Sequence, residues 1–230
     1  PVVLFSASFM VPRQIAVGQV VVQEVAAGSP AALGGIQPGD VLVSINGNEI
    51  QNVGDLRYQI QLNLGKPVDM ALKRADSLLV VRAVPRWRPP PGEGATGITV
   101  RLENATTASI SYPVWRAVPM GIRTLGQTFV LVKNTVVGWF IGGGAPQVTG
   151  PVGIAEITGQ VARAGVSPLL EFTGLLSINL AILNLFPIPG LDGGRLVFVV
   201  IEAIRRGRRI SPQREGLIHM IGFVALLALV

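Results

Sequence analysis

The fold is decided by the stretch FTGLLSINLAILNLFPIPGLDGG, residues Phe172 to Gly194. Residues 172 to 191 carry no formal charge, and a helix of these 20 residues is long enough to cross the hydrocarbon core of a bilayer, which is about 30 Å thick. Asp192 closes the run, and a carboxylate in that position is costly unless it is paired, hydrated or bound to a metal. Because Pro187 and Pro189 disfavour helix in the residues before them, the stretch predicts a helix that breaks just ahead of Asp192.

Residue chemistry leaves two interpretations of Asp192 open. In the first, Asp192 is the N-cap of a following interfacial helix from Arg195 to Arg205, and Asp-Gly-Gly is an ordinary turn. In the second, Asp192 is a functional carboxylate, because broken backbone at membrane depth persists only where it is buried in protein or lines a wet cavity.

The composition favours a membrane protein with one water-exposed module, since 49% of the residues are hydrophobic and only 14% are charged. The net charge of +6 comes mainly from arginine. These basic residues are not interleaved with aromatic residues, so nucleic acid is not an expected partner. The sequence has no cysteine, which excludes a disulfide framework and a thiolate metal site.

The two ends of the sequence are apolar but short for a membrane span. We expect residues 1–12 to be the end of a truncated transmembrane helix and residues 216–230 to be the start of a truncated last transmembrane helix. The sequence is therefore expected to be a fragment of a longer protein.

Residues 14–104 are predicted to form a soluble module of short strands and helices. Strands are expected at 20–25, 41–45, 68–73 and 78–84, and helices at 31–33, with Ser29 as N-cap and Pro30 first, and at 55–64. This order, with GSPAALGGIQPGDVLVSINGNEI at its centre, resembles a PDZ domain in its bacterial, circularly permuted form, in which the ligand-edge strand comes last.

In this sequence the ligand-edge strand would be residues 97–102. The resemblance implies a groove in which an extended peptide pairs with this strand beside the 55–64 helix. Leu56, Tyr58 and Ile60 would be divided between the groove wall and the core. The peptide-binding residues implied by the resemblance are Gly97, Ile98, Val100, Leu56 and Ile60.

Residues 112–165 are predicted to form amphipathic, membrane-associated linker helices. Apolar residues recur every three or four positions from Val118 to Phe140, with Trp115 and Trp139 near the ends of this stripe. The pattern favours a helix that lies in the membrane interface, and a transmembrane span is the alternative.

Residues 167–206 are predicted to form the main membrane helix, with Ser167 as its N-cap, the break, and a continuation after it. Five arginines crowd the next loop: Arg205, Arg206, Arg208, Arg209 and Arg214. By the positive-inside rule this loop is cytoplasmic, so the PDZ-like module is expected outside the cytoplasm of a multi-pass protein of the inner (plasma) membrane.

The string from Asn184 to Gly193 resembles the Asn-x-x-Pro-x-x-x-Leu-Asp-Gly segment of the site-2 protease family, zinc metalloproteases that cut within membranes. The resemblance implies that Asp192 is the third zinc ligand and that Asn184 and Pro187 belong to the catalytic segment, with Asn184 near the reacting peptide. The other two ligands would come from an H-E-x-x-H helix upstream, which this sequence lacks. Its single histidine, His219, has no Glu at the required spacing and is expected to make a polar contact within the bundle rather than to bind zinc.

The resemblance implies an α+β protein, with a PDZ-like small β-barrel or sandwich containing two helices followed by an all-α membrane segment. Zn²⁺ would be the cofactor of the parent protein, and the fragment alone is expected to be inactive. The implied substrates are transmembrane proteins such as anti-sigma factors, which the PDZ-like module would screen or bind. A non-catalytic, membrane-anchored PDZ adaptor that binds extended peptide ends is the alternative, and a transporter is disfavoured because no second interrupted segment appears as a repeat partner.

Overall fold

The structure is a computed structural model, and it describes residues 1–141, 150–204 and 212–229. The chain divides into two compact units. The sheet unit contains Phe9–Arg116 and Arg123–Gln147, and the helical unit contains Pro1–Ser8, Ala117–Ile122 and Val148–Val230.

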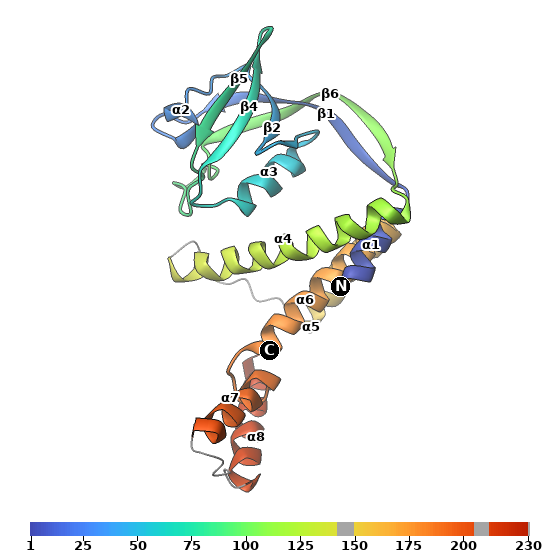
Figure 1. Ribbon diagram of the computed structural model, residues 1–230, viewed down its shortest axis with the longest axis vertical. Coiled ribbons are helices and arrows are strands. Elements are labelled where there is room, and N and C mark those ends of the chain that lie inside the picture. Colours follow the sequence, from blue (N-terminus) through green and yellow to red (C-terminus); the bar gives the residue numbers. More distant parts are fainter. Residues whose placement is uncertain (142–149, 205–211, 230) are drawn as a thin grey trace. The chain divides into compact units, whose positions relative to one another are not determined.

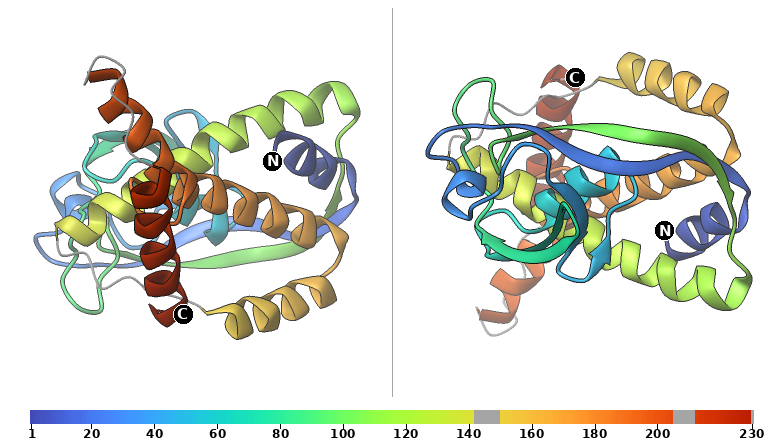
Figure 2. Two further views of the ribbon diagram at one scale, coloured as in Figure 1. Left: turned by 90° about the horizontal axis from the view of Figure 1, so that it is seen from below. Right: turned by 90° about the horizontal axis from the view of Figure 1, so that it is seen from above.

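The sheet unit is built on an antiparallel sheet with the order β5-β4-β2-β1-β6, and a short β3 pairs with β2. The strands are β1 (Arg13–Val25), β2 (Val41–Ile45), β3 (Asn48–Glu49), β4 (Val68–Arg74), β5 (Ser77–Ala83) and β6 (Ile98–Ile110). The long β1 and β6 run side by side in all views (Figures 1 and 2). β6 is therefore the edge strand of the described sheet, as the sequence predicts for the ligand-edge strand.

Two short helices of the sheet unit begin at polar caps. α2 (Pro30–Leu33) starts at Pro30, and the Ser29 hydroxyl accepts a hydrogen bond from the Ala32 amide at 3.2 Å, so the predicted cap is confirmed. α3 (Val53–Leu62) starts two residues before the predicted position because Asn52 is its cap and accepts from the Asp55 amide at 2.9 Å.

The hydrophobic core of this unit lies between the sheet and α3. Alternate residues of β4, namely Val68, Met70 and Leu72, are fully buried, as the two-residue period of a strand requires. They join a cluster with residues of the other elements: Val20, Val22, Ala31, Ile36, Leu42, Ile45, Ile50, Leu56, Ile60 and Ala83.

One buried carboxylate lies beside this core. Asp40 accepts two hydrogen bonds from Arg74, at 2.7 and 2.8 Å, and one from the Gln37 amide at 2.8 Å. The Arg74 guanidinium therefore holds the pKa of Asp40 below its ordinary value, against the opposite effect of burial. This pair ties the turn before β2 to the end of β4.

α4 (Val114–Phe140) is a helix of 27 residues, and its part from Arg123 onward belongs to the sheet unit. Its polar residues bond to that unit: Gln127 accepts from the Tyr58 hydroxyl at 3.2 Å, and Asn134 donates to the Gln61 carbonyl at 2.8 Å. The prediction for Tyr58 is wrong, because its hydroxyl bonds to α4 and the half-buried ring is part of neither the groove wall nor the buried core.

The helical unit contains α5 (Pro151–Ala164), α6 (Val166–Leu185), α7 (Asp192–Ile204) and α8 (Pro212–Leu229), together with most of α1 (Val2–Met10). Of the helices in the described ranges, α6 alone is long and apolar enough to cross a membrane. α6 starts before the predicted cap. Ser167 lies inside its first turn, is buried, and donates to the Ser8 carbonyl at 2.9 Å instead.

One prediction concerns residues outside the described ranges. Four arginines of the predicted cytoplasmic loop are among these residues: Arg205, Arg206, Arg208 and Arg209.

Candidate functional site

The predicted interruption of the membrane helix lies between α6 and α7, and we call residues 186–191 the break. α6 ends at Leu185, and Phe186 is already extended, with φ −64° and ψ 141°. Two short turns follow, in which Ile188 donates to the Phe186 carbonyl at 2.7 Å and Leu191 donates to the Ile188 carbonyl at 3.1 Å. Gly190 has a φ of 98°, which a residue with a side chain rarely adopts. α7 then begins at Asp192.

Asp192 is exposed at the first position of α7. In the described ranges its carboxylate has no hydrogen-bond or ion-pair partner, so it makes no capping bond to a backbone amide. Within the described ranges its oxygens therefore have no competing partner and can accept a ligand.

Two glycines after Asp192 fix how α7 begins. Gly193 and Gly194 are buried, and a Cβ added at Gly194 would lie 2.5 Å from the Ile188 carbonyl oxygen. A Cβ on Gly193 would overlap the carbonyl groups of Leu185 and Phe186. The first turn of α7 is thus packed backbone against backbone on the break.

The other residues predicted for this segment lie close to Asp192 in sequence. Asn184 is half-buried in the last turn of α6, and Pro187 is exposed in the break. His219 of α8 makes the polar contact that was expected, since its Nδ1 accepts a hydrogen bond from the Gly190 amide at 3.0 Å.

A carboxylate oxygen is a normal zinc ligand, and Asp192 fits this role because it has no competing partner in the described ranges. The described residues contain no group of three or more His, Cys, Asp or Glu side chains that could hold a metal ion. Within the described part of the chain, Asp192 is thus a candidate donor without a cluster of further His, Cys, Asp or Glu side chains around it.

A second site lies in the sheet unit, where α3 and β6 enclose a groove with a volume of about 460 Å³. Four of the five predicted peptide-binding residues line it: Leu56 and Ile60 of α3, and Ile98 and Val100 of β6. Gly97 does not line the groove, because its carbonyl accepts from the Ala26 amide at 2.8 Å and it holds the turn into β6 with a φ of 76°.

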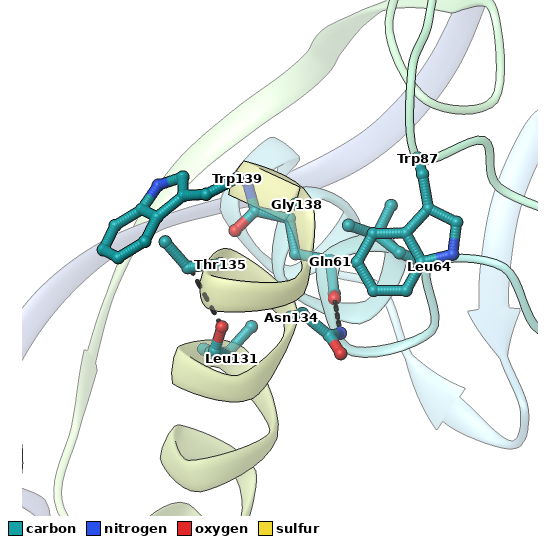
Figure 3. Close-up of a pocket in the computed structure, with 8 residues that line it drawn as sticks. All are labelled: Gln61, Leu64, Trp87, Leu131, Asn134, Thr135, Gly138 and Trp139. Atoms are coloured by element: carbon teal, nitrogen blue, oxygen red, sulfur yellow. Dashed lines mark hydrogen bonds between the residues drawn. The ribbon is translucent and has the colours of Figure 1, made fainter. Parts of the chain in front are cut away.

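A smaller cleft of about 230 Å³, which the sequence did not signal, lies between α4 and the end of α3 (Figure 3). Trp87 and Trp139 lie at its two ends, and the Asn134 amide, bonded to the Gln61 carbonyl, lies between them. Gln61 lines both the cleft and the groove. Sequence gave no signal for it because its walls come from segments about 70 residues apart.

Comparison with known proteins shows that the chain belongs to a family of zinc metalloproteases. That family is Peptidase family M50, the site-2 protease family, whose sequence profile matches residues 2–229. The family predicted from the Asn184–Gly193 string is thus confirmed.

Two similar proteins are curated as proteases. Regulator of sigma-W protease RasP from Bacillus subtilis (strain 168) is 35% identical over 205 residues, which are 87% of this chain and 47% of that protein. Zinc metalloprotease RasP from Geobacillus kaustophilus (strain HTA426) is 33% identical over 215 residues, which are 91% of this chain and 48% of that protein. The chain spans about half the length of the curated relatives it matches.

Among solved structures, the PDZ domain of the SdrC-like protein from Listeria monocytogenes is 24% identical, with a TM-score of 0.32. The match covers 35% of this chain and 85% of that domain.

Proposed function

We propose that this chain is the carboxy-terminal part of an intramembrane zinc metalloprotease, in which Asp192 is one metal ligand. The observation that carries the proposal is an unpartnered carboxylate, placed at the start of α7 directly after a break in the one helix of the described ranges that is suited to cross a membrane. Membership of Peptidase family M50 supports it.

In this proposal the remaining ligands are two histidines of an H-E-x-x-H helix elsewhere in the complete protein. The share of each relative that the chain covers, about half, is consistent with this. When bound, zinc would act as a Lewis acid and would lower the pKa of a water molecule bound to it to about 7.

In this proposal the residues of this chain would hold the metal and orient the substrate. Asp192 would provide a carboxylate oxygen as one metal ligand. Asn184, in the last turn of α6, offers an amide that can hydrogen-bond the peptide group of a substrate. Pro187 keeps the break from becoming helix, which leaves room for an extended peptide beside Asn184.

The substrates we propose are membrane-spanning segments of proteins such as anti-sigma factors. The name of the Bacillus subtilis relative, a regulator of sigma-W protease, supports this class. The groove between α3 and β6 would receive an extended end of such a substrate by strand addition, because β6 is an edge strand with apolar pockets beside it.

For placement in the cell we propose a multi-pass protein of the inner membrane. α6 would span the bilayer and α4 would lie along its surface, with the PDZ-like domain of residues 14–104 outside the cytoplasm and the arginine-rich loop inside. Residues 1–12 and 216–230 would be parts of further membrane helices, and residues 112–165 would be linkers on the membrane.

The test uses the complete protein with Asp192→Ala, purified in detergent. We expect zinc content to fall well below one ion per molecule and cleavage of a model transmembrane substrate to be lost. Glu202→Ala, a carboxylate replacement in the same helix, is the matched control and should keep both. Normal zinc content and cleavage in the Asp192→Ala protein would favour the alternative function, a membrane-anchored adaptor whose groove binds peptide ends.

A further inference from the structure

His219 connects α8 to the break that precedes Asp192. It is the only histidine of the sequence, and its Nδ1 accepts a hydrogen bond from the Gly190 amide at 3.0 Å across 29 residues. Gly190 has a φ of 98°, so the chain turns at the residue whose amide His219 binds. The hydrogen bond therefore holds the one left-handed residue of the break.

The bond also defines the form of the imidazole. A neutral ring that accepts at Nδ1 carries its proton on Nε2. Nε2 is buried and has no hydrogen-bond partner in the described ranges. The ring of Phe198, which lies on α7, is 5.5 Å from the imidazole between centroids. The imidazole is thus packed against the helix that begins with Asp192 while it binds the break.

A close backbone contact lies one turn further along α8. A Cβ added at Gly222 would overlap the Pro189 carbonyl, and a Cβ added at Gly190 would lie 2.8 Å from the Phe223 amide nitrogen. His219 and Gly222 are three residues apart and share one face of the helix. This face holds the break by one hydrogen bond and by one contact that only glycine permits.

The break is therefore held from two directions. α8 fixes Pro189 and Gly190, whereas the buried Gly193 and Gly194 fix the first turn of α7 on the other end of the break. Asp192 lies between these two contacts. Since one exposed side chain at a helix start has little packing of its own, the direction of its carboxylate depends on the backbone that carries it.

We propose that the His219–Gly222 face of α8 is a positioning element for the metal-ligating carboxylate of Asp192, with His219 acting through the Gly190 amide and not as a ligand. The inference rests on the proposed function of Asp192. Residues that orient a metal ligand without touching the metal typically change metal affinity by about 10- to 100-fold when they are replaced.

The test compares four variants of the complete protein in detergent: His219→Leu, His219→Asn, Met220→Leu and Asp192→Ala. Leucine removes the acceptor, whereas the asparagine side-chain oxygen stands at the same distance from the backbone as Nδ1 and restores it. Met220 is exposed on α8 beside His219 and is the matched control. Zinc affinity is measured by chelator competition, and amide hydrogen exchange is followed in the peptide that covers residues 186–194.

We expect His219→Leu to weaken zinc binding by about tenfold or more and to speed exchange in the break. His219→Asn should stay within about threefold of wild type in zinc affinity, and Met220→Leu should be unchanged. If His219→Leu does not fold, judged by size-exclusion chromatography, His219→Asn decides: retained zinc affinity supports the proposal, and a loss as large as tenfold overturns it.

The variants also distinguish a failure of the positioning role of His219 from a failure of the proposed function of Asp192. Wild-type zinc affinity and exchange in His219→Leu, together with zinc loss in Asp192→Ala, would overturn the positioning role and leave the proposed function in place. Retention of zinc by Asp192→Ala would overturn the proposed function itself.

Discussion

Replacement of Asn134 by alanine should loosen α3, the helix that walls the peptide groove. Asn134 is 5% exposed, and its side-chain amide donates to the Gln61 carbonyl at 2.8 Å. The last carbonyl groups of a helix lack partners within it, and α3 ends at Leu62. The Asn134 amide supplies one of these missing partners from α4.

The size of the effect follows from this one bond. A net hydrogen bond contributes about 1 kcal/mol, and water can reach the exposed Gln61, so we expect a local loss of roughly 1 kcal/mol. For exchange by local opening this corresponds to amide hydrogen exchange about fivefold faster in α3. Hydrogen exchange with mass spectrometry on the chain in detergent measures it.

The control is Thr135→Ala. Thr135 is the next residue, is exposed, and its hydroxyl donates to the Leu131 carbonyl within α4 at 3.0 Å. It should leave exchange in α3 unchanged. Exchange in α3 within twofold of wild type for Asn134→Ala, or equal acceleration by Thr135→Ala, would refute the reasoning.

Three further predictions concern charge, membrane contact and the groove. Asp40→Asn should lower the urea midpoint of unfolding at pH 7. A carboxylate with a lowered pKa stabilises the fold above its unfolded pKa, about 4, and loses that effect as the pH falls through the folded pKa, so the difference in midpoint from wild type should shrink towards pH 2. An equal difference at pH 7 and pH 2 would contradict this prediction. Because the sequence has no cysteine, a fluorophore can be attached to a single introduced cysteine. We expect brominated lipid to quench the fluorophore strongly in Phe129→Cys and little in Thr135→Cys. Equal quenching at the two positions would argue against α4 lying on the membrane. Ile98→Asp should weaken binding of an extended peptide with an aliphatic carboxyl end by about tenfold in fluorescence polarisation, and unchanged binding would exclude the α3–β6 groove.

Features set by neighbouring residues could be predicted from sequence. The Ser29 cap, Pro30 at the start of α2 and the break before Asp192 all follow from local chemistry, and each lies where the sequence places it. The edge position of β6 followed from the resemblance to a permuted PDZ domain, and the sheet order agrees with it.

Features that depend on a distant partner could not be predicted. The sequence predicts these two strands only at 20–25 and 97–102, whereas β1 begins at Arg13 and β6 continues to Ile110. The additional residues are strand because they pair with each other, up to Arg13 with Ile110 at the far end of the ladder. The hydrogen bonds from Asn134 to Gln61 and from Gly190 to His219 join residues 73 and 29 positions apart. Ser167 bonds to Ser8 instead of capping α6 for the same reason.

α4 shows what such contacts add to a sequence pattern. Its polar face, with Gln127 and Asn134, bonds to the sheet unit, whereas Phe129 and Phe140 of its apolar stripe are 48% and 87% exposed. A helix on a soluble protein does the reverse, since its apolar stripe faces the core. Exposure of this stripe is costly in water and favourable in the membrane interface, where apolar side chains reach the acyl boundary. The inverted polarity therefore supports a location of α4 on the bilayer surface and makes the quenching contrast between positions 129 and 135 the decisive measurement.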